Sequence, residues 1–245
     1  MAAHRIGRHP RSAGLPLDAV TSNSSSTAKE SCYLCGATDD LTGDHVPPEN
    51  LFPPPKPNNL ITVACCRRCN GNFSADDEAF RVFASSVLGR SPAGARVWKE
   101  GVVDSSFRRS PKLRANVAKH LAQMVVKTDR GHFSALGITI PEDRATRYLV
   151  RLAKGLTRHF DPTIDYVDAT FDVRQLFPTQ ETFDLLLRTF PYAERGEEVF
   201  GFWRGFADDD SRGLWVYAFY GALFFMVTIE DYKRRPPASA PEKRQ

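Results

Sequence analysis

The cysteines of this 245-residue chain have types and spacing that suit metal binding. All five lie between positions 32 and 69, where Cys32-x-x-Cys35 and Cys66-x-x-Cys69 form two close pairs with 30 residues between them. Two such pairs can place four thiolates around one zinc ion in a tetrahedral site. We therefore expect Cys32, Cys35, Cys66 and Cys69 to bind a structural zinc ion, with Cys65 as a neighbour that is not a ligand.

A second set of polar residues could carry chemistry, because a zinc ion with four cysteine ligands has no open position. Asp44-His45 lies between the two cysteine pairs, and a histidine beside a carboxylate suits a general base that activates water. Asp44 and Asn70 offer a carboxylate and an amide oxygen, which are hard ligands that suit Mg²⁺ or Mn²⁺. Such an ion would stabilise charge on a phosphodiester. Taken alone, Asp44 and His45 would more often be a turn and a packed imidazole.

Taken jointly, these motifs resemble the HNH nuclease family in its zinc-bearing ββα-metal form. Asp44-His45-Val46-Pro47 is similar to the first-strand signature, Asn59-Leu60 to the middle asparagine on the second strand, and Cys66-Arg67-Arg68-Cys69-Asn70 to the second knuckle. The resemblance implies a general base at His45, an orienting residue at Asn59, and a catalytic divalent ion on Asp44 and Asn70. The implied activity is that of a metal-dependent endonuclease that hydrolyses phosphodiester bonds, with DNA favoured over RNA.

The sequence departs from the family pattern in three places. Asn59 and Asn70 are eleven positions apart, which is longer than the common spacing, so Asn58 could replace Asn59. Asn72 also follows Asn70 closely, and either amide could be the ligand. The basic residue that often follows the last motif position is absent, because Phe73-Ser-Ala-Asp-Asp-Glu78 stands there. These acids are typical of the first turn of a helix, although one of them could bind metal.

Basic residues indicate where nucleic acid could lie. Arg67 and Arg68 are expected to contact backbone phosphates from the second knuckle. A second basic cluster comprises Arg108, Arg109, Lys112, Arg114 and Lys119. The expected helix 142–160 carries Arg144, Arg147, Arg151, Lys154 and Arg158 on one face. That face could follow phosphates, but an ordinary solvated helix face is the favoured interpretation.

Hydrophobic periodicity predicts the elements that position these residues. Strands are expected at 42–46 and 59–63, around a proline-rich loop, followed by a helix at 75–88. The spacing of Leu113, Val117, Leu121 and Val125 predicts a helix that begins at Pro111. Further expected elements are helices at 142–160 and 181–190 and strands at 167–173, 199–206, 214–219 and 222–229, with a turn at 208–213. The aromatic residues of these last strands are expected to pack in the core.

The resulting fold class is α+β: a small zinc-stapled ββα-metal HNH module, a helical middle and an antiparallel β-rich C-terminal region. We expect four segments along the chain. Residues 1–30 form a disordered leader, residues 31–90 the HNH nuclease module, residues 91–235 an α+β accessory domain of open function, and residues 236–245 a disordered tail.

Composition limits the class of protein. The net charge of +4 and pI near 8.8 permit a nucleic-acid partner without requiring one. Clustered cysteines and the lack of an apolar N-terminal run favour a metal site in a reducing, cytoplasmic setting over a secreted disulfide framework. No apolar stretch predicts a membrane span. The alternative function is a non-catalytic zinc-binding module that docks nucleic acid or protein, and the oligomeric state is open.

Overall fold

The computed structural model describes residues 31–128, 131–166, 168–207 and 212–234. It is a mixed α+β structure with an antiparallel β-rich C-terminal region, as the sequence predicts. The expected leader, the expected tail and most of the expected turn at 208–213 lie outside the described residues.

The first elements form a hairpin followed by helices. β1 (Leu41–His45) pairs with β2 (Thr62–Cys66) in an antiparallel register that sets His45 opposite Thr62 and Leu41 opposite Cys66. A 3-10 turn η2 (Glu49–Leu51) lies in the loop between the strands, and α1 (Arg67–Asn72) and α2 (Ser74–Ser86) follow β2. The chain order β1, β2, α1 therefore brings the residues on either side of the hairpin to one place.

The second strand begins later than its expected start at Asn59. Asn58 and Asn59 form a turn, and β2 starts only at Thr62. The Val46 amide still donates to the Ile61 carbonyl at 2.9 Å, but Pro47 follows it and has no backbone N–H to extend the ladder. The prediction that Asn59 lies on the second strand is therefore wrong.

The middle of the chain is only partly helical. Its elements are α3 (Pro92–Arg96), a π-helical segment η3 (Val97–Ser106), α4 (Phe107–Arg109), α5 (Pro111–Ala118), β3 (Leu121–Thr128) and β4 (Gly131–Ile138). The prediction that the helix from Pro111 continues to Val125 is wrong, because β3 begins at Leu121 and pairs with β4 in a hairpin. The helix does begin as expected, with the Ser110 hydroxyl accepting a hydrogen bond from the Leu113 amide at 3.1 Å.

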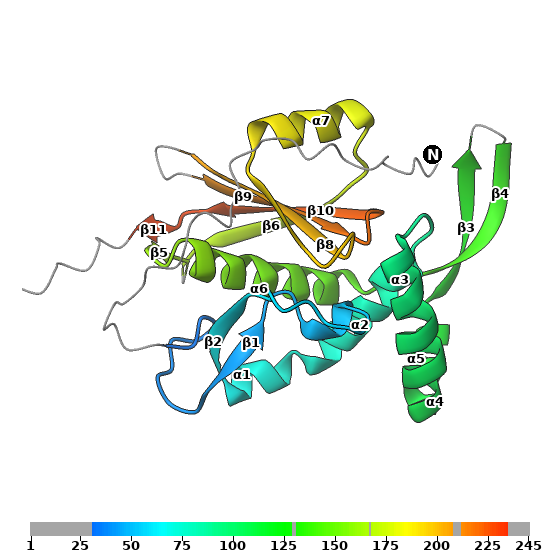
Figure 1. Ribbon diagram of the computed structural model, residues 1–245, viewed down its shortest axis with the longest axis horizontal. Helices are drawn as coiled ribbons and strands as arrows, with labels where there is room; N and C mark the ends of the chain where they lie inside the picture. The colour runs from blue at the N-terminus through cyan, green and yellow to red at the C-terminus, as the bar shows by residue number, and fades with distance from the viewer. Residues whose placement is uncertain (1–30, 129–130, 167, 208–211, 235–245) are drawn as a thin grey trace, which may run out of the picture.

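The C-terminal part is a sheet with a helix on each face. Its elements are β5 (Ile164–Asp165), β6 (Thr170–Leu176), α7 (Gln180–Thr189), β7 (Tyr192–Arg195), β8 (Phe200–Phe206), β9 (Arg212–Phe219), β10 (Leu223–Glu230) and β11 (Lys233–Arg234). Five of these strands form an antiparallel sheet in the order β6-β10-β9-β8-β7. The long helix α6 (Glu142–Phe160) precedes them and lies between this sheet and the β1–β2 unit, while α7 covers the opposite face (Figure 1).

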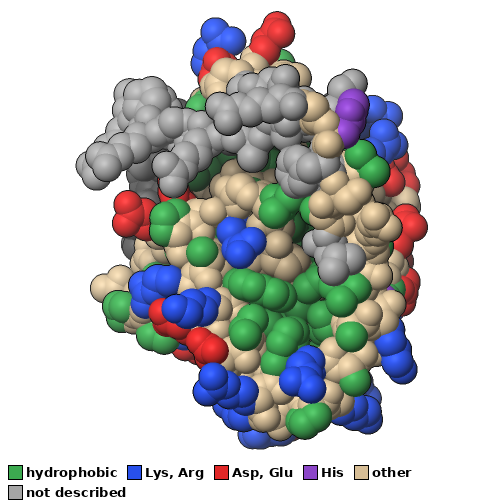
Figure 2. Space-filling model, turned by 90° about the vertical axis from the view of Figure 1, so that its right-hand side faces the viewer, with side chains coloured by type: hydrophobic (Ala, Val, Ile, Leu, Met, Phe, Trp, Pro, Cys, Tyr) green, Lys and Arg blue, Asp and Glu red, His purple; other side chains and the backbone are tan. Residues whose placement is uncertain are grey.

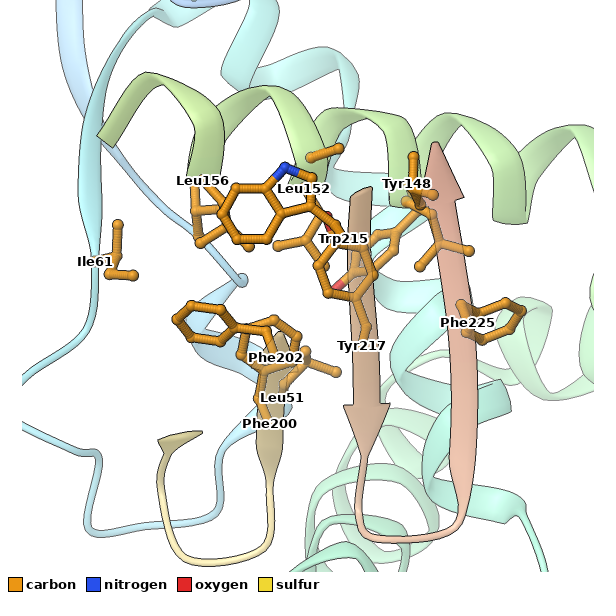
Figure 3. Close-up of a cluster of buried hydrophobic side chains, with 14 of the residues drawn as sticks. Leu51, Ile61, Tyr148, Leu152, Leu156, Phe200, Phe202, Trp215, Tyr217 and Phe225 are labelled. Carbon is orange, nitrogen blue, oxygen red and sulfur yellow. The ribbon is translucent and has the colours of Figure 1, made fainter. Parts of the chain in front are cut away.

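The main hydrophobic core lies around α6. Tyr148, Leu152 and Leu156 of α6 point toward Phe202, Trp215 and other side chains of the sheet (Figure 3). Alternation along β9 sends Trp215, Tyr217 and Phe219 to this core and Val216 and Ala218 to a smaller cluster under α7. The main core also includes Cys32, Val46, Leu51 and Phe80, so it is continuous across the predicted boundary at residues 90–91.

Candidate functional site

Four of the five cysteines converge at the end of the β1–β2 hairpin. The sulfur atoms of Cys32, Cys35, Cys66 and Cys69 all lie within 4.8 Å of one another, so the group could hold a metal ion. A turn brings the first pair together, because the Gly36 amide donates to the Cys32 carbonyl at 2.8 Å and Gly36 has a φ of +75°. Cys66 ends β2 and Cys69 lies one turn into α1.

The protonation of these thiols is unequal. Burial opposes ionisation of Cys32, but hydrogen bonds with the backbone of Cys66, Leu34 and Cys35 outweigh it and lower its pKa to about 6. Burial and hydrogen bonds with neighbouring thiols raise the pKa of Cys69 to about 12. The protein alone therefore favours the thiolate at Cys32 and the neutral thiol at Cys69, and a bound cation would favour ionisation of Cys69.

Cys65 faces the core instead. Its side chain is fully buried, and its sulfur lies 3.9 Å from that of Cys32. Burial and the negative charges of Cys32 and Asp44 raise the pKa of Cys65 well above its usual range. The set of four converging thiols leaves Cys65 out, in agreement with the sequence prediction.

A cleft of about 390 Å³ lies beside the hairpin. Asp44 and His45 from β1 and Asn70 from α1 all line it, so three of the predicted site residues share one cavity. The remaining lining residues are Gly43, Pro48, Glu49, Asn50, Lys56 and Asp77.

Asp44 takes part in a buried network of hydrogen bonds and ion pairs with Arg151. The Arg151 guanidinium donates to Asp44 Oδ1 at 2.8 Å and to Asp44 Oδ2 at 2.9 Å, and its Nη1 donates to Asp77 Oδ1 at 2.6 Å. The Tyr33 hydroxyl donates to Asp44 Oδ2 at 2.7 Å. Burial raises the pKa of Asp77, against the opposing charge of Arg151. Helix α6 thus contacts two of the carboxylates that line the cleft through one arginine.

His45 and Asn70 keep hydrogen-bonding capacity at the cleft. The half-buried His45 imidazole has no hydrogen-bond partner among the residues the structure describes. Asn70 donates its amide to the Thr42 hydroxyl at 3.4 Å, which leaves its carbonyl oxygen as an acceptor. A base and two oxygen donors are therefore present in one cavity.

The other predicted site residues lie elsewhere. Asn59 is exposed in the turn before β2 and does not line the cleft, and neither does Asn58. Arg67 and Arg68 are exposed on α1. Arg67 forms a 3.2 Å ion pair with Asp40, in which both side chains are more than half exposed, so this pair stabilises little.

The basic residues of helix 142–160 contact other parts of the protein along much of its length. Arg144 and Arg147 pair with Asp76 at 3.1 and 3.0 Å, and Arg151 is buried. Lys154 lies over the rings of Tyr166 and Phe171. A plain solvated face is therefore wrong for Arg151 and Lys154, whereas the Arg147 side chain stays 49% exposed beside its ion pair. The acids Asp76 and Asp77, expected as first-turn residues of a helix, also pair with these arginines.

Sequence reasoning missed three residues of the site. Arg151 was placed on an outer face, although a buried carboxylate in Asp44-His45 would call for a cation. Asn50 and Lys56 enter the cleft from the proline-rich loop, and no periodicity predicts where a loop side chain will point. The presence of a lysine and an asparagine within that proline-rich loop was the one feature of the sequence that could have indicated them.

Comparisons with known proteins give no family for this chain: no family model, no curated protein and no solved structure matches it. Within the described residues, no helix has both the length and the apolar character needed to cross a membrane.

Proposed function

We propose that this chain is an HNH-type endonuclease that uses a divalent metal ion to hydrolyse phosphodiester bonds of nucleic acid, with DNA favoured over RNA. The observation that carries the proposal is that Asp44, His45 and Asn70 line one cleft beside a cluster of four thiols. A zinc ion on the four thiols would hold the end of β2 and the start of α1 together, and so hold the walls of the cleft.

In this mechanism His45 removes a proton from water, which attacks the phosphorus. Its imidazole lines the cleft without a hydrogen-bond partner in the described part of the chain, as a base awaiting a water molecule requires. Asp44 and Asn70 would hold Mg²⁺ or Mn²⁺, and such an ion would neutralise charge on the phosphodiester and the leaving oxygen. Asp44 Oδ1 accepts one hydrogen bond, so it retains a lone pair for an ion.

Exposed cations support nucleic acid as the partner. Residues 105–128 contain no acid, and five of their basic side chains are exposed along α4, α5 and the segment after them: Arg108, Arg109, Lys112, Arg114 and Lys119. Figure 2 shows the face of the molecule that carries these elements, with Lys and Arg side chains around a group of hydrophobic ones. Such a surface attracts a phosphate backbone without reading sequence.

The competing function is a zinc module that binds without cutting. One observation favours it: Arg151 neutralises both Asp44 and Asp77, and these supply two of the three carboxylates on the cleft. A cleft with less negative charge binds a divalent cation less tightly.

Cleavage of supercoiled plasmid separates the two functions. The zinc-loaded wild type should nick the plasmid in Mg²⁺ or Mn²⁺, and His45→Ala should lose on the order of 10²-fold or more of this activity. Chelation of the divalent ion should stop cleavage while the four-thiol site keeps its zinc.

Equal activity in the wild type and His45→Ala would remove His45 from the mechanism. Binding of DNA or RNA with no cleavage of either by the wild type would favour the non-catalytic module. Asn59→Ala serves as a matched amide control, because Asn59 lies outside the cleft and should retain activity.

A further inference from the structure

We propose that Lys56 is the phosphate-binding cation of the cleft. The segment directly after the second cysteine pair, where a basic residue was expected, contains none up to Glu78. This inference rests on the proposed function and names a further substrate-binding residue of the same site. Lys56 enters the cleft from the loop between β1 and β2. It therefore precedes the second cysteine pair in the sequence, whereas the expected cation would follow that pair.

Two backbone carbonyls position the Lys56 ammonium group. Its Nζ donates to the Glu49 carbonyl at 2.8 Å and to the Phe52 carbonyl at 2.5 Å. An ammonium group has three N–H donors, so one remains for a ligand. Both carbonyls belong to the η2 turn and the residue after it, and Phe52 is buried in the main core. The charge is therefore held at a defined place on the cleft wall.

The ammonium group lacks an anionic partner. No carboxylate in the described part of the chain forms an ion pair with Lys56, although Glu49 lines the same cleft. Burial lowers the pKa of Lys56; the charge of Glu49 opposes this effect and that of Arg81 adds to it. A cation that no carboxylate contacts gains stabilisation when an anion binds beside it.

The remaining charges of the cleft agree with a phosphate at this position. Arg151 pairs with Asp44 and Asp77, so these two carboxylates repel an anion less than two free acids would. This cavity therefore has a cation without a contacting carboxylate at Lys56 and a base at His45 along its walls.

A structural role for Lys56 predicts different results. The same two hydrogen bonds would also stabilise the η2 turn, so loss of Lys56 could simply loosen the loop. Lys56→Gln distinguishes the roles, because glutamine keeps N–H donors for the carbonyls but carries no charge, while Lys56→Arg keeps the charge. Lys99→Met is the matched control, since Lys99 is exposed on η3 and does not line the cleft.

The experiment measures binding of a short fluorescent DNA duplex by the full-length, zinc-loaded protein over a range of NaCl concentrations. All variants are made on the His45→Ala background, so that no cleavage intervenes. Loss of one phosphate contact should reduce the slope of log affinity against log salt by about 0.9. Lys56→Gln should show this reduction, and Lys56→Arg and Lys99→Met should not.

A slope unchanged in Lys56→Gln, or a lowered melting temperature as its only effect, would overturn the proposal. The outcome for the Lys56 phosphate contact can be distinguished from the outcome for nuclease activity. A reduced slope with no cleavage by the wild type would keep the phosphate contact and reject the nuclease. Cleavage by the wild type with an unchanged slope would do the reverse. No binding of either duplex DNA or RNA by any variant would overturn the phosphate contact as well.

Discussion

At the scale of single residues, Arg151 is the side chain on which the site depends most. It is 5% exposed and joins two buried carboxylates to one guanidinium. Taking charges out of water is expensive, and such a group persists only when every charge has a partner. Arg151 also lies over the Phe73 ring at 4.8 Å, which adds a cation–π contact.

Arg151→Met should therefore destabilise the protein by about 3–5 kcal/mol, because it leaves Asp44 and Asp77 buried without a cation. Urea denaturation at neutral pH measures the change. Arg158→Met is the control on the same helix, since Arg158 forms no ion pair with any residue the structure describes, and it should change stability by under about 1 kcal/mol. A similar small change in both variants would show that the network contributes little.

Asp161, at the end of α6, should make stability depend on pH. Burial opposes its ionisation, but hydrogen bonds from Thr163 and Arg234 at 2.5 and 2.7 Å, with the charges of Arg234 and Arg204, lower its pKa. A carboxyl with a lowered folded pKa stabilises the protein above its ordinary pKa of 3.8, and this stabilisation is lost as the pH falls through the folded value.

Asp161→Asn should thus cost about 1–2 kcal/mol at pH 7 and progressively less below about pH 4, in denaturant titrations at several pH values. Asp168→Asn is the comparison, because Asp168 is 74% exposed in its ion pair with Lys233 and should have almost no effect at either pH. A loss in Asp161→Asn that does not vary with pH would contradict the assignment.

Residue types and spacing predicted the four converging thiols, because the two-residue spacing within each cysteine pair already places both sulfur atoms close together. They also indicated Asp44, His45 and Asn70, which the fold brings to one cleft. They did not predict Arg151 as the partner of Asp44, 107 positions away, since that contact depends on how α6 packs. Asn59 was misplaced because the resemblance specified an asparagine but not the length of the turn before β2.

At the scale of elements, α6 packs between the hairpin and the sheet. A glycine on α6 allows the helix to approach the chain at the end of β1 closely. A Cβ atom at Gly155 would lie 2.7 Å from Val46 Cγ2 and 3.0 Å from Val46 Cγ1. Val46 is the residue after His45, so the packing of α6 sets the position of the chain that carries the expected base.

Gly155→Ala should accordingly destabilise the protein by about 1–3 kcal/mol, although alanine in a helix normally stabilises by about 1 kcal/mol relative to glycine. Thermal unfolding measures the change. Gly71→Ala in α1 is the control, because a Cβ there meets nothing within 4 Å and should give no loss. A higher melting temperature for Gly155→Ala would mean that α6 and the hairpin can move apart freely.

Elements with long regular periodicity were predicted well, and α6 matches its expected range of 142–160. The β3–β4 hairpin was not predicted, because Leu113, Val117, Leu121 and Val125 keep a helical spacing across the end of α5. The β-branched pair Val125-Val126 and the turn glycine Gly131, with a φ of +118°, were the competing local signals.

At the scale of the whole molecule, one core unites the cysteine region with the C-terminal sheet. Cys32, Cys65 and Cys66 belong to the same hydrophobic cluster as Trp215, whose indole donates to the Thr157 hydroxyl on α6 at 3.1 Å. Unfolding of the cysteine region should therefore also disrupt the packing of side chains on the C-terminal sheet.

Removal of the zinc proposed for the four thiols, by a strong chelator, should shift tryptophan emission to longer wavelength and lower the melting temperature by about 5 °C or more in a single transition. The fluorescence change and far-UV circular dichroism should coincide. Cys35→Ser should behave like the chelated protein and Cys65→Ala should keep one zinc ion per chain. Loss of helix and strand signal with unchanged tryptophan emission would show that the two parts unfold independently.

The β3–β4 hairpin has a consequence for handling the protein at high concentration. In the described residues each of its strands pairs only with the other, so each has one edge of unpaired backbone groups. Leu121, Met124 and Val125 on β3 are 46%, 46% and 70% exposed. An apolar edge of this kind is a template for strand addition between chains. Aggregation should therefore begin at this hairpin, and a lysine at Val125 is the first solubilising change to introduce.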